Sequence, residues 1–109
     1  EDGNALEFNK KGGTGCISVT ANVAARLCSE MQNASLEKNN IDLQKRAVEI
    51  NKLLTPLNNS LFIESNPSPV KYAASLLKLS SDDVRLPLVK ITEPTKSAVK
   101  KALEHAVLI

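Results

Sequence analysis

Glycines and hydroxyl side chains between residues 12 and 22 are the first candidates for chemistry in this sequence. Gly12-Gly13-Thr14-Gly15 has the composition of a phosphate-binding loop. Such a loop follows a strand and opens a helix, whereas these glycines precede an apolar run, so we interpret them as a tight turn. Ser18 and Thr20 have no companion base nearby in the sequence, which argues against nucleophilic catalysis by either. A backbone contact to a substrate is the better interpretation of this stretch.

The other titratable side chains form no recognisable catalytic or metal-binding pattern. His105 is the only histidine, so a zinc site would lack ligands, and we interpret it as a surface residue near a helix end. A Schiff-base lysine needs a desolvated setting, whereas Lys71 stands at a predicted helix start where we expect it to be exposed. Asp82-Asp83 is interpreted as a loop turn, and Glu1-Asp2 lacks its preceding context. The residues themselves therefore indicate no catalytic group, cofactor site or metal site.

The two cysteines are interpreted as structural. Cys16 and Cys28 have neither the close spacing of a metal-binding pair nor the number expected of a disulfide framework. We expect two buried free thiols in a cytoplasmic protein.

A single strand is predicted in this sequence, and it has no visible partner. Residues 16–20 form a short apolar, β-branched run of the kind that is covered on both faces. Asn22 or Thr20 is expected to cap the helix that follows. Because a lone strand cannot satisfy its own backbone hydrogen bonds, we expect strand 16–20 to pair on both edges with strands outside this chain. The chain is thus predicted to be part of a larger protein.

Helical patterns account for most of the remaining residues. Apolar residues recur every three or four positions, and Gly, Asn and Pro punctuate the pattern. Ser68 and Pro69 suit a helix entry, whereas Pro56 is expected to bend or loosen the helix that contains it. A polar turn is predicted at 37–40 and a loop at 80–93. The predicted helices are 4–11, 23–34, 41–58, 70–79 and 95–107.

Composition excludes several broad classes. The 109 residues are 42% hydrophobic and 24% charged, as in an ordinary soluble protein. A net charge of +2, without a basic patch among aromatic residues, gives no indication of nucleic-acid binding. No apolar run has the length of a membrane span. Two Phe, one Tyr and no Trp are few aromatic residues for a self-sufficient core.

Three segments in order resemble the dihydrodipicolinate synthase (4-hydroxy-tetrahydrodipicolinate synthase) family of bacteria. The segment Gly-Gly-Thr-Gly-Cys-Ile-Ser-Val-Thr-Ala-Asn-Val-Ala-Ala-Arg at 12–26 is similar to the last barrel strand and its helix. Asn66-Pro67-Ser68-Pro69-Val70-Lys71 resembles the family's Asn-Pro-x-Pro-Val-Lys segment, and Arg85-Leu86-Pro87 its Arg-Leu-Pro loop. The similarity covers essentially the whole chain and corresponds to the C-terminal third of the enzyme.

The resemblance implies an α/β fold, namely the last part of a (β/α)8 TIM barrel followed by a C-terminal helical domain. It places strand 8 and its flanking helices at residues 1–36 and the helical domain at 37–109. It also implies a cytoplasmic lyase of lysine and diaminopimelate biosynthesis, which condenses pyruvate with L-aspartate 4-semialdehyde through a lysine Schiff base. The catalytic lysine lies upstream in the family, so this chain alone is expected to be inactive.

One site residue and the oligomeric state also follow from the resemblance. Ile17 is the only family site residue that maps onto the chain, and its main-chain carbonyl would border the pyruvate adduct. Glu1 and Asp2 would follow barrel strand seven, close to the site but without an assigned role. No cofactor is implied. The expected partners are the barrel segment that precedes this chain and a second copy, in a dimer or dimer of dimers. Lys10-Lys11 would repel across the weaker contact of a homotetramer.

Two other functions remain open at the level of the sequence. One is another pyruvate-dependent aldolase of the same superfamily, similar to N-acetylneuraminate lyase, against which the segment at 66–71 argues. The other is a stand-alone helical interaction module, against which the unpaired strand argues.

Overall fold

The computed structural model describes all 109 residues and consists of helices joined by turns and one long extended connection. All five predicted helices form, with ends that differ from the predicted ends by a few residues. A short 3-10 turn, η1, precedes them at Asp2–Asn4. The helices are α1 (Ala5–Lys10), α2 (Ala21–Leu36), α3 (Ile41–Ser60), α4 (Ser68–Leu76) and α5 (Glu93–His105).

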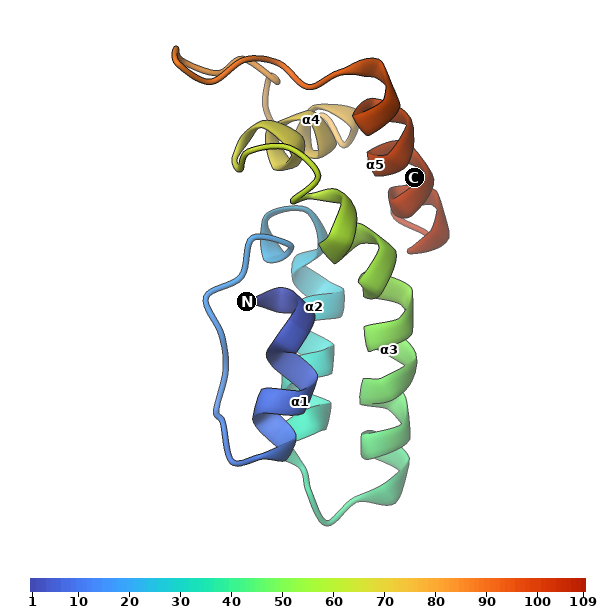
Figure 1. The fold of residues 1–109 in the computed structure, drawn as a ribbon. Helices are drawn as coiled ribbons and strands as arrows, with labels where there is room; N and C mark the ends of the chain where they lie inside the picture. Colours follow the sequence, from blue (N-terminus) through green and yellow to red (C-terminus); the bar gives the residue numbers. More distant parts are fainter.

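Helices α2 and α3 form an antiparallel hairpin that carries most of the core (Figure 1). The apolar stripe predicted for α2 is buried at all four of its positions, which are Val23, Leu27, Met31 and Ala34. The facing stripe of α3 buries Ala47, Ile50, Leu54 and Leu57. Each fully buried leucine or isoleucine of this kind contributes about 1.5–3 kcal/mol relative to an exposed one. The hairpin therefore provides the surface on which the other elements pack.

The predicted strand 16–20 does not form, and this expectation is wrong for the chain by itself. Residues 13–18 are an extended connection without ladder hydrogen bonds, and a turn at 19–20 leads into α2. The physical reason is the lack of a partner strand, because a strand is stable only when neighbouring strands accept and donate its backbone hydrogen bonds. No strand is present among the 109 residues.

The extended segment 13–18 nevertheless joins two helices that run in the same direction (Figure 1). Helix α1 packs against α2, and the segment returns along the pair from the end of α1 to the start of α2. A helix–strand–helix unit of an α/β protein has the same connectivity. Gly12 and Gly15 have φ angles of 102° and 149°, so the predicted glycine turn is present at the start of this connection.

The contact between α1 and α2 contains a buried polar group. Asn9 is fully buried, and its Nδ2 donates to Gln32 Oε1 at 2.7 Å and to Ser35 Oγ at 2.8 Å. The Oδ1 atom of Asn9 has no hydrogen-bond partner. Directional bonds therefore fix how α1 lies on α2, at the cost of one unpaired acceptor.

Helices α4 and α5 pack on the C-terminal part of the hairpin. Val70 and Ala73 of α4, with Val99 and Leu103 of α5, belong to the same apolar core as α2 and α3. Pro56 lies on the exposed side of α3, which continues through it to Ser60. The carboxylate of Glu64 accepts from the backbone N–H of Thr92 at 2.9 Å and so anchors the start of α5. None of the helices combines the length and the apolar character needed to cross a membrane.

Side chains close the predicted turn at 37–40 from both ends. Asn40 Oδ1 accepts from the N–H of Leu43 at 3.1 Å, which caps the start of α3. Gln44 Nε2 lies 3.3 Å, 3.2 Å and 3.0 Å from the carbonyl oxygens of Ala34, Ser35 and Glu37. The carbonyls of Ala34 and Glu37 also accept from the backbone N–H groups of Glu37 and Asn40. The Gln44 amide is therefore a second donor to these two carbonyls and supplies the donor that the Ser35 carbonyl otherwise lacks at the end of α2.

We expect Gln44→Ala to lower the free energy of unfolding by about 1 kcal/mol, because the Ser35 carbonyl loses its donor and two further carbonyls lose their second donor. Urea denaturation of the chain measures the effect. Lys45→Ala is the matched control, since Lys45 is exposed and should change stability by less than about 0.5 kcal/mol. Equal stability of the two variants would show that the Gln44 contacts contribute nothing.

Candidate functional site

Ile17 is the last residue but one of the extended segment 13–18, and its side chain points away from the helices. Its side chain is 98% exposed. Cys16 and Ser18, on either side of it, line a cavity of about 240 Å³ together with Cys28 on α2 and Asn58 on α3. Side chains of an extended chain alternate in this way between two faces. The segment thus presents Ile17 on the face opposite to the helices.

The carboxylate of Asp2 holds the end of this segment. Its Oδ2 accepts from the backbone N–H groups of Val19 at 2.9 Å and Thr20 at 3.1 Å, and its Oδ1 accepts from the Ser18 hydroxyl. Ser18 Oγ in turn accepts from the N–H of Ala21 at 2.9 Å. No role for Asp2 could be predicted from the sequence, because its partners lie 16 to 18 residues further along the chain.

The start of α2 is also tied to α3, and the expected cap is not formed. Thr20 is fully buried, and its hydroxyl donates to Asn58 Oδ1 at 2.6 Å instead of capping the helix. Asn22 does not accept from the helix either, since its amide donates to the carbonyl of Val19 at 3.0 Å. Ser18 Oγ accepts from the first N–H group of α2, that of Ala21, whereas the next two N–H groups donate to the backbone carbonyls of Val19 and Thr20.

Both cysteines are free thiols, as predicted. Cys28 is buried, whereas Cys16 is only partly buried, and the amide of Gln32 donates to Cys16 Sγ at 3.6 Å. Burial, followed by the negative charge of Asp2, raises the pKa of Cys28 to about 11 and also raises the pKa of Cys16. A raised pKa keeps both thiols protonated and weakly nucleophilic at neutral pH.

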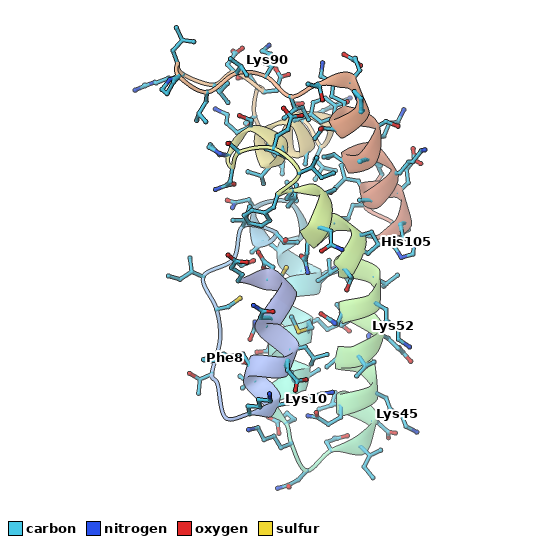
Figure 2. All side chains as sticks on the ribbon, in the orientation of Figure 1. Phe8, Lys10, Lys45, Lys52, Lys90 and His105 are labelled. Carbon is cyan, nitrogen blue, oxygen red and sulfur yellow. The ribbon has the colours of Figure 1, made fainter.

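The other residues considered in the sequence lie apart from this cavity. A Cβ atom at Gly13 would lie 2.1 Å from Cδ2 of Phe8, so this glycine is required by packing. Figure 2 shows Phe8 on the side of α1 that faces the extended segment, and His105 at the far end of α5. Lys71 is half-buried and lines a separate open groove with Asp83 and Arg85. No group of three or more His, Cys, Asp or Glu side chains is arranged to hold a metal ion.

The expected loop turn at Asp82-Asp83 is closed by ion pairing. Lys90 Nζ lies 3.1 Å from Asp82 Oδ1 and 3.3 Å from Asp83 Oδ1. Hydrogen bonding to Lys90 lowers the pKa of Asp82. Lys90 stands on the loop that leads to α5 (Figure 2), so the two aspartates serve the loop and not the cavity around Ser18.

The chain, with one extended segment that connects two parallel helices, was compared with known protein families and structures, and it is similar to one class of enzyme. The profile of the Dihydrodipicolinate synthetase family matches residues 1–106, so the chain belongs to this family. The 4-hydroxy-tetrahydrodipicolinate synthase of Pelagibacter ubique is 59% identical over 108 residues, which are 99% of this chain and 36% of that protein. The chain spans about a third of the length of the relatives it matches.

Solved structures give the same result. The dihydrodipicolinate synthase of Acinetobacter baumannii in complex with pyruvate is 36% identical, with a TM-score of 0.89 over 99% of this chain and 36% of that one. A monomeric dihydrodipicolinate synthase variant is 34% identical, also with a TM-score of 0.89, over 100% of this chain and 35% of that one. The helices of the chain are therefore arranged as in these enzymes.

We expect alkylation of Cys28 by iodoacetamide to rise about tenfold for each pH unit between about pH 7 and pH 10, because its thiolate fraction still grows in that range. The Cys16→Ser variant isolates Cys28, and peptide mass spectrometry follows the reaction. In urea, the alkylation rate of Cys28 should stop rising once the pH exceeds the ordinary pKa of a thiol. A rate in the folded protein that levels off near neutral pH would contradict the burial of Cys28.

Proposed function

We propose that this chain forms part of a Schiff-base lyase that condenses pyruvate with L-aspartate 4-semialdehyde to give 4-hydroxy-tetrahydrodipicolinate, in lysine and diaminopimelate biosynthesis. The observation that carries the proposal is family membership over residues 1–106, together with relatives that bear the name of this synthase. The pyruvate complex of the Acinetobacter baumannii enzyme supports pyruvate as one substrate. The two free thiols fit our further proposal of a cytoplasmic enzyme.

Within this enzyme we assign substrate binding to the main-chain carbonyl of Ile17. Ile17 lies on a segment whose backbone has no ladder partner in the chain, and its side chain turns away from the helices. In a complete sheet, the end of a strand exposes carbonyls that the ladder no longer uses, so such a carbonyl is available to a ligand. The side chain would then contribute packing, and the carbonyl would contribute the contact to the pyruvate adduct.

We infer that the extended segment 13–18 becomes strand 8 of a (β/α)8 barrel when the rest of the enzyme is present. A groove beside it is lined by Ala5, Phe8, Cys16 and Ile17, and Phe8 is 56% exposed. Burying these apolar side chains against further strands would be favourable, and it would also pair the free backbone groups. Residues 1–36 would then close the barrel, and residues 37–109 would form the helical domain.

We propose a dimer, or a dimer of dimers, as the assembly of the enzyme. Lys10 and Lys11 are both exposed at the end of α1, where like charges would weaken a two-fold contact. The match to a monomeric variant indicates that this arrangement of helices is compatible with different assemblies.

We expect the chain by itself to form no Schiff base with pyruvate, because the sequence offers no counterpart of the family's catalytic lysine. Borohydride reduction in the presence of pyruvate, followed by mass spectrometry, is the measurement. The positive control is a hybrid enzyme in which this chain replaces the matching segment of the Pelagibacter ubique synthase. The hybrid should be active, and borohydride should trap pyruvate on it. An adduct on any lysine of the chain alone, Lys71 included, would overturn the assignment.

We expect Ile17→Val to change the free energy of unfolding of the chain by less than about 0.5 kcal/mol, because the side chain is exposed there. In the hybrid enzyme the same change should cost about 0.5–1.5 kcal/mol, as for a buried methylene, and leave the KM for pyruvate nearly unchanged. Urea denaturation and pyruvate kinetics measure both quantities. Loss of turnover in a hybrid that still folds would mean that the side chain takes part in chemistry.

A further inference from the structure

Asp2 is the only charged side chain among the buried residues, at 6% exposure. It belongs to none of the ion pairs of the chain, and all of its hydrogen-bond donors are neutral. Burying a carboxylate without a cationic partner is costly unless several hydrogen bonds compensate it. The three bonds from residues 18–20 supply that compensation, so the carboxylate and this turn depend on each other.

The bonds of Asp2 act on the residues that immediately follow Ile17. The carbonyl of Ile17 and the N–H of Ser18 belong to one planar peptide unit, so the position of Ser18 sets the direction of that carbonyl. Ser18 is held on both sides, since its hydroxyl donates to Asp2 and accepts from Ala21. Ladder bonds do not restrain this part of the segment within the chain. Asp2 therefore supplies a restraint on the Ile17–Ser18 peptide unit that does not depend on neighbouring strands.

We propose that Asp2 is a positioning residue that aims the Ile17 carbonyl at the pyruvate adduct. This inference rests on the function proposed above and extends it from one contact residue to the side chain that holds it. Asp2 itself does not touch the substrate. It acts through the backbone of Ser18, Val19 and Thr20.

The hydrogen-bond pattern predicts that acceptor geometry matters more than charge. An asparagine at position 2 can turn its oxygen toward the N–H groups of Val19 and Thr20, while its amide donates to Ser18 Oγ. An alanine leaves both N–H groups and the serine hydroxyl without this partner. Asp2→Asn should therefore rescue most of what Asp2→Ala loses.

The test compares pyruvate kinetics of the hybrid enzyme with and without these substitutions. Asp2→Ala should lower kcat/KM for pyruvate by about tenfold to a hundredfold, as expected when a reacting group is misplaced. Asp2→Asn should stay within about threefold of the unsubstituted hybrid. Asn40→Ala is the control for general destabilisation, because it removes the cap of α3, and it should leave the KM for pyruvate unchanged in the folded enzyme.

Two kinetic outcomes overturn the proposal. The first is an Asp2→Ala hybrid whose kcat/KM lies within about twofold of the unsubstituted hybrid. The second is an Asp2→Asn hybrid as impaired as Asp2→Ala, which would mean that hydrogen-bond geometry is not what Asp2 provides. An unsubstituted hybrid that is inactive overturns the proposed function itself, and the role of Asp2 in catalysis with it.

Amide hydrogen exchange of the chain separates the two failures. Asp2→Ala should speed exchange at Val19 and Thr20, because their N–H groups lose the carboxylate, while amides in the middle of α3 keep their rates. Unchanged exchange at Val19 and Thr20 overturns the positioning contact, whatever the kinetics show.

Discussion

The burial of the apolar faces of α2 and α3 against each other is the interaction on which the remaining elements depend. It brings Met31 and Ala34 of one helix into the same core as Ala47 and Ile50 of the other, and these side chains are almost completely withdrawn from water. Helix α1 lies on one side of this pair, and α4 and α5 lie at its end (Figure 1). None of these shorter helices has an apolar surface large enough to be stable without it.

Polar bonds then decide the details that apolar packing leaves open. Asp2, Thr20 and Asn58 connect η1, the start of α2 and α3 through short side-chain bonds. Gln44 and Asn40 do the same for the turn at the other end of the hairpin. Hydrogen bonds are directional, so they fix the register of elements that hydrophobic contact alone would allow to slide. The two ends of the hairpin are thus specified by a few polar side chains each.

The helices could be predicted because the residue pattern that specifies each of them lies within its own segment. The contacts around Ser18 and Asp2 could not be predicted in this way. The spacing of Leu43, Ala47, Ile50 and Leu54 in the sequence is itself the record of a buried helix face, and glycine and proline mark where helices end. A strand at residues 16–20 needs neighbouring strands to pair with, and this chain does not contain them. The strand is therefore predicted from the sequence but does not form in the chain. The partners of Asp2 are distant in sequence and include backbone N–H groups. Every residue except proline has such a group, so no sequence pattern could identify these partners.

The apolar core runs without interruption across residue 37, from Ala5 and Leu27 to Val99 and Leu103. The proposed border between barrel and helical domain therefore separates two parts of the chain that share one apolar core. A cut or a recombination crossover at this point would separate the matching apolar faces of α2 and α3. Helices α2 and α3 would therefore have to be exchanged together for their facing apolar side chains to stay matched.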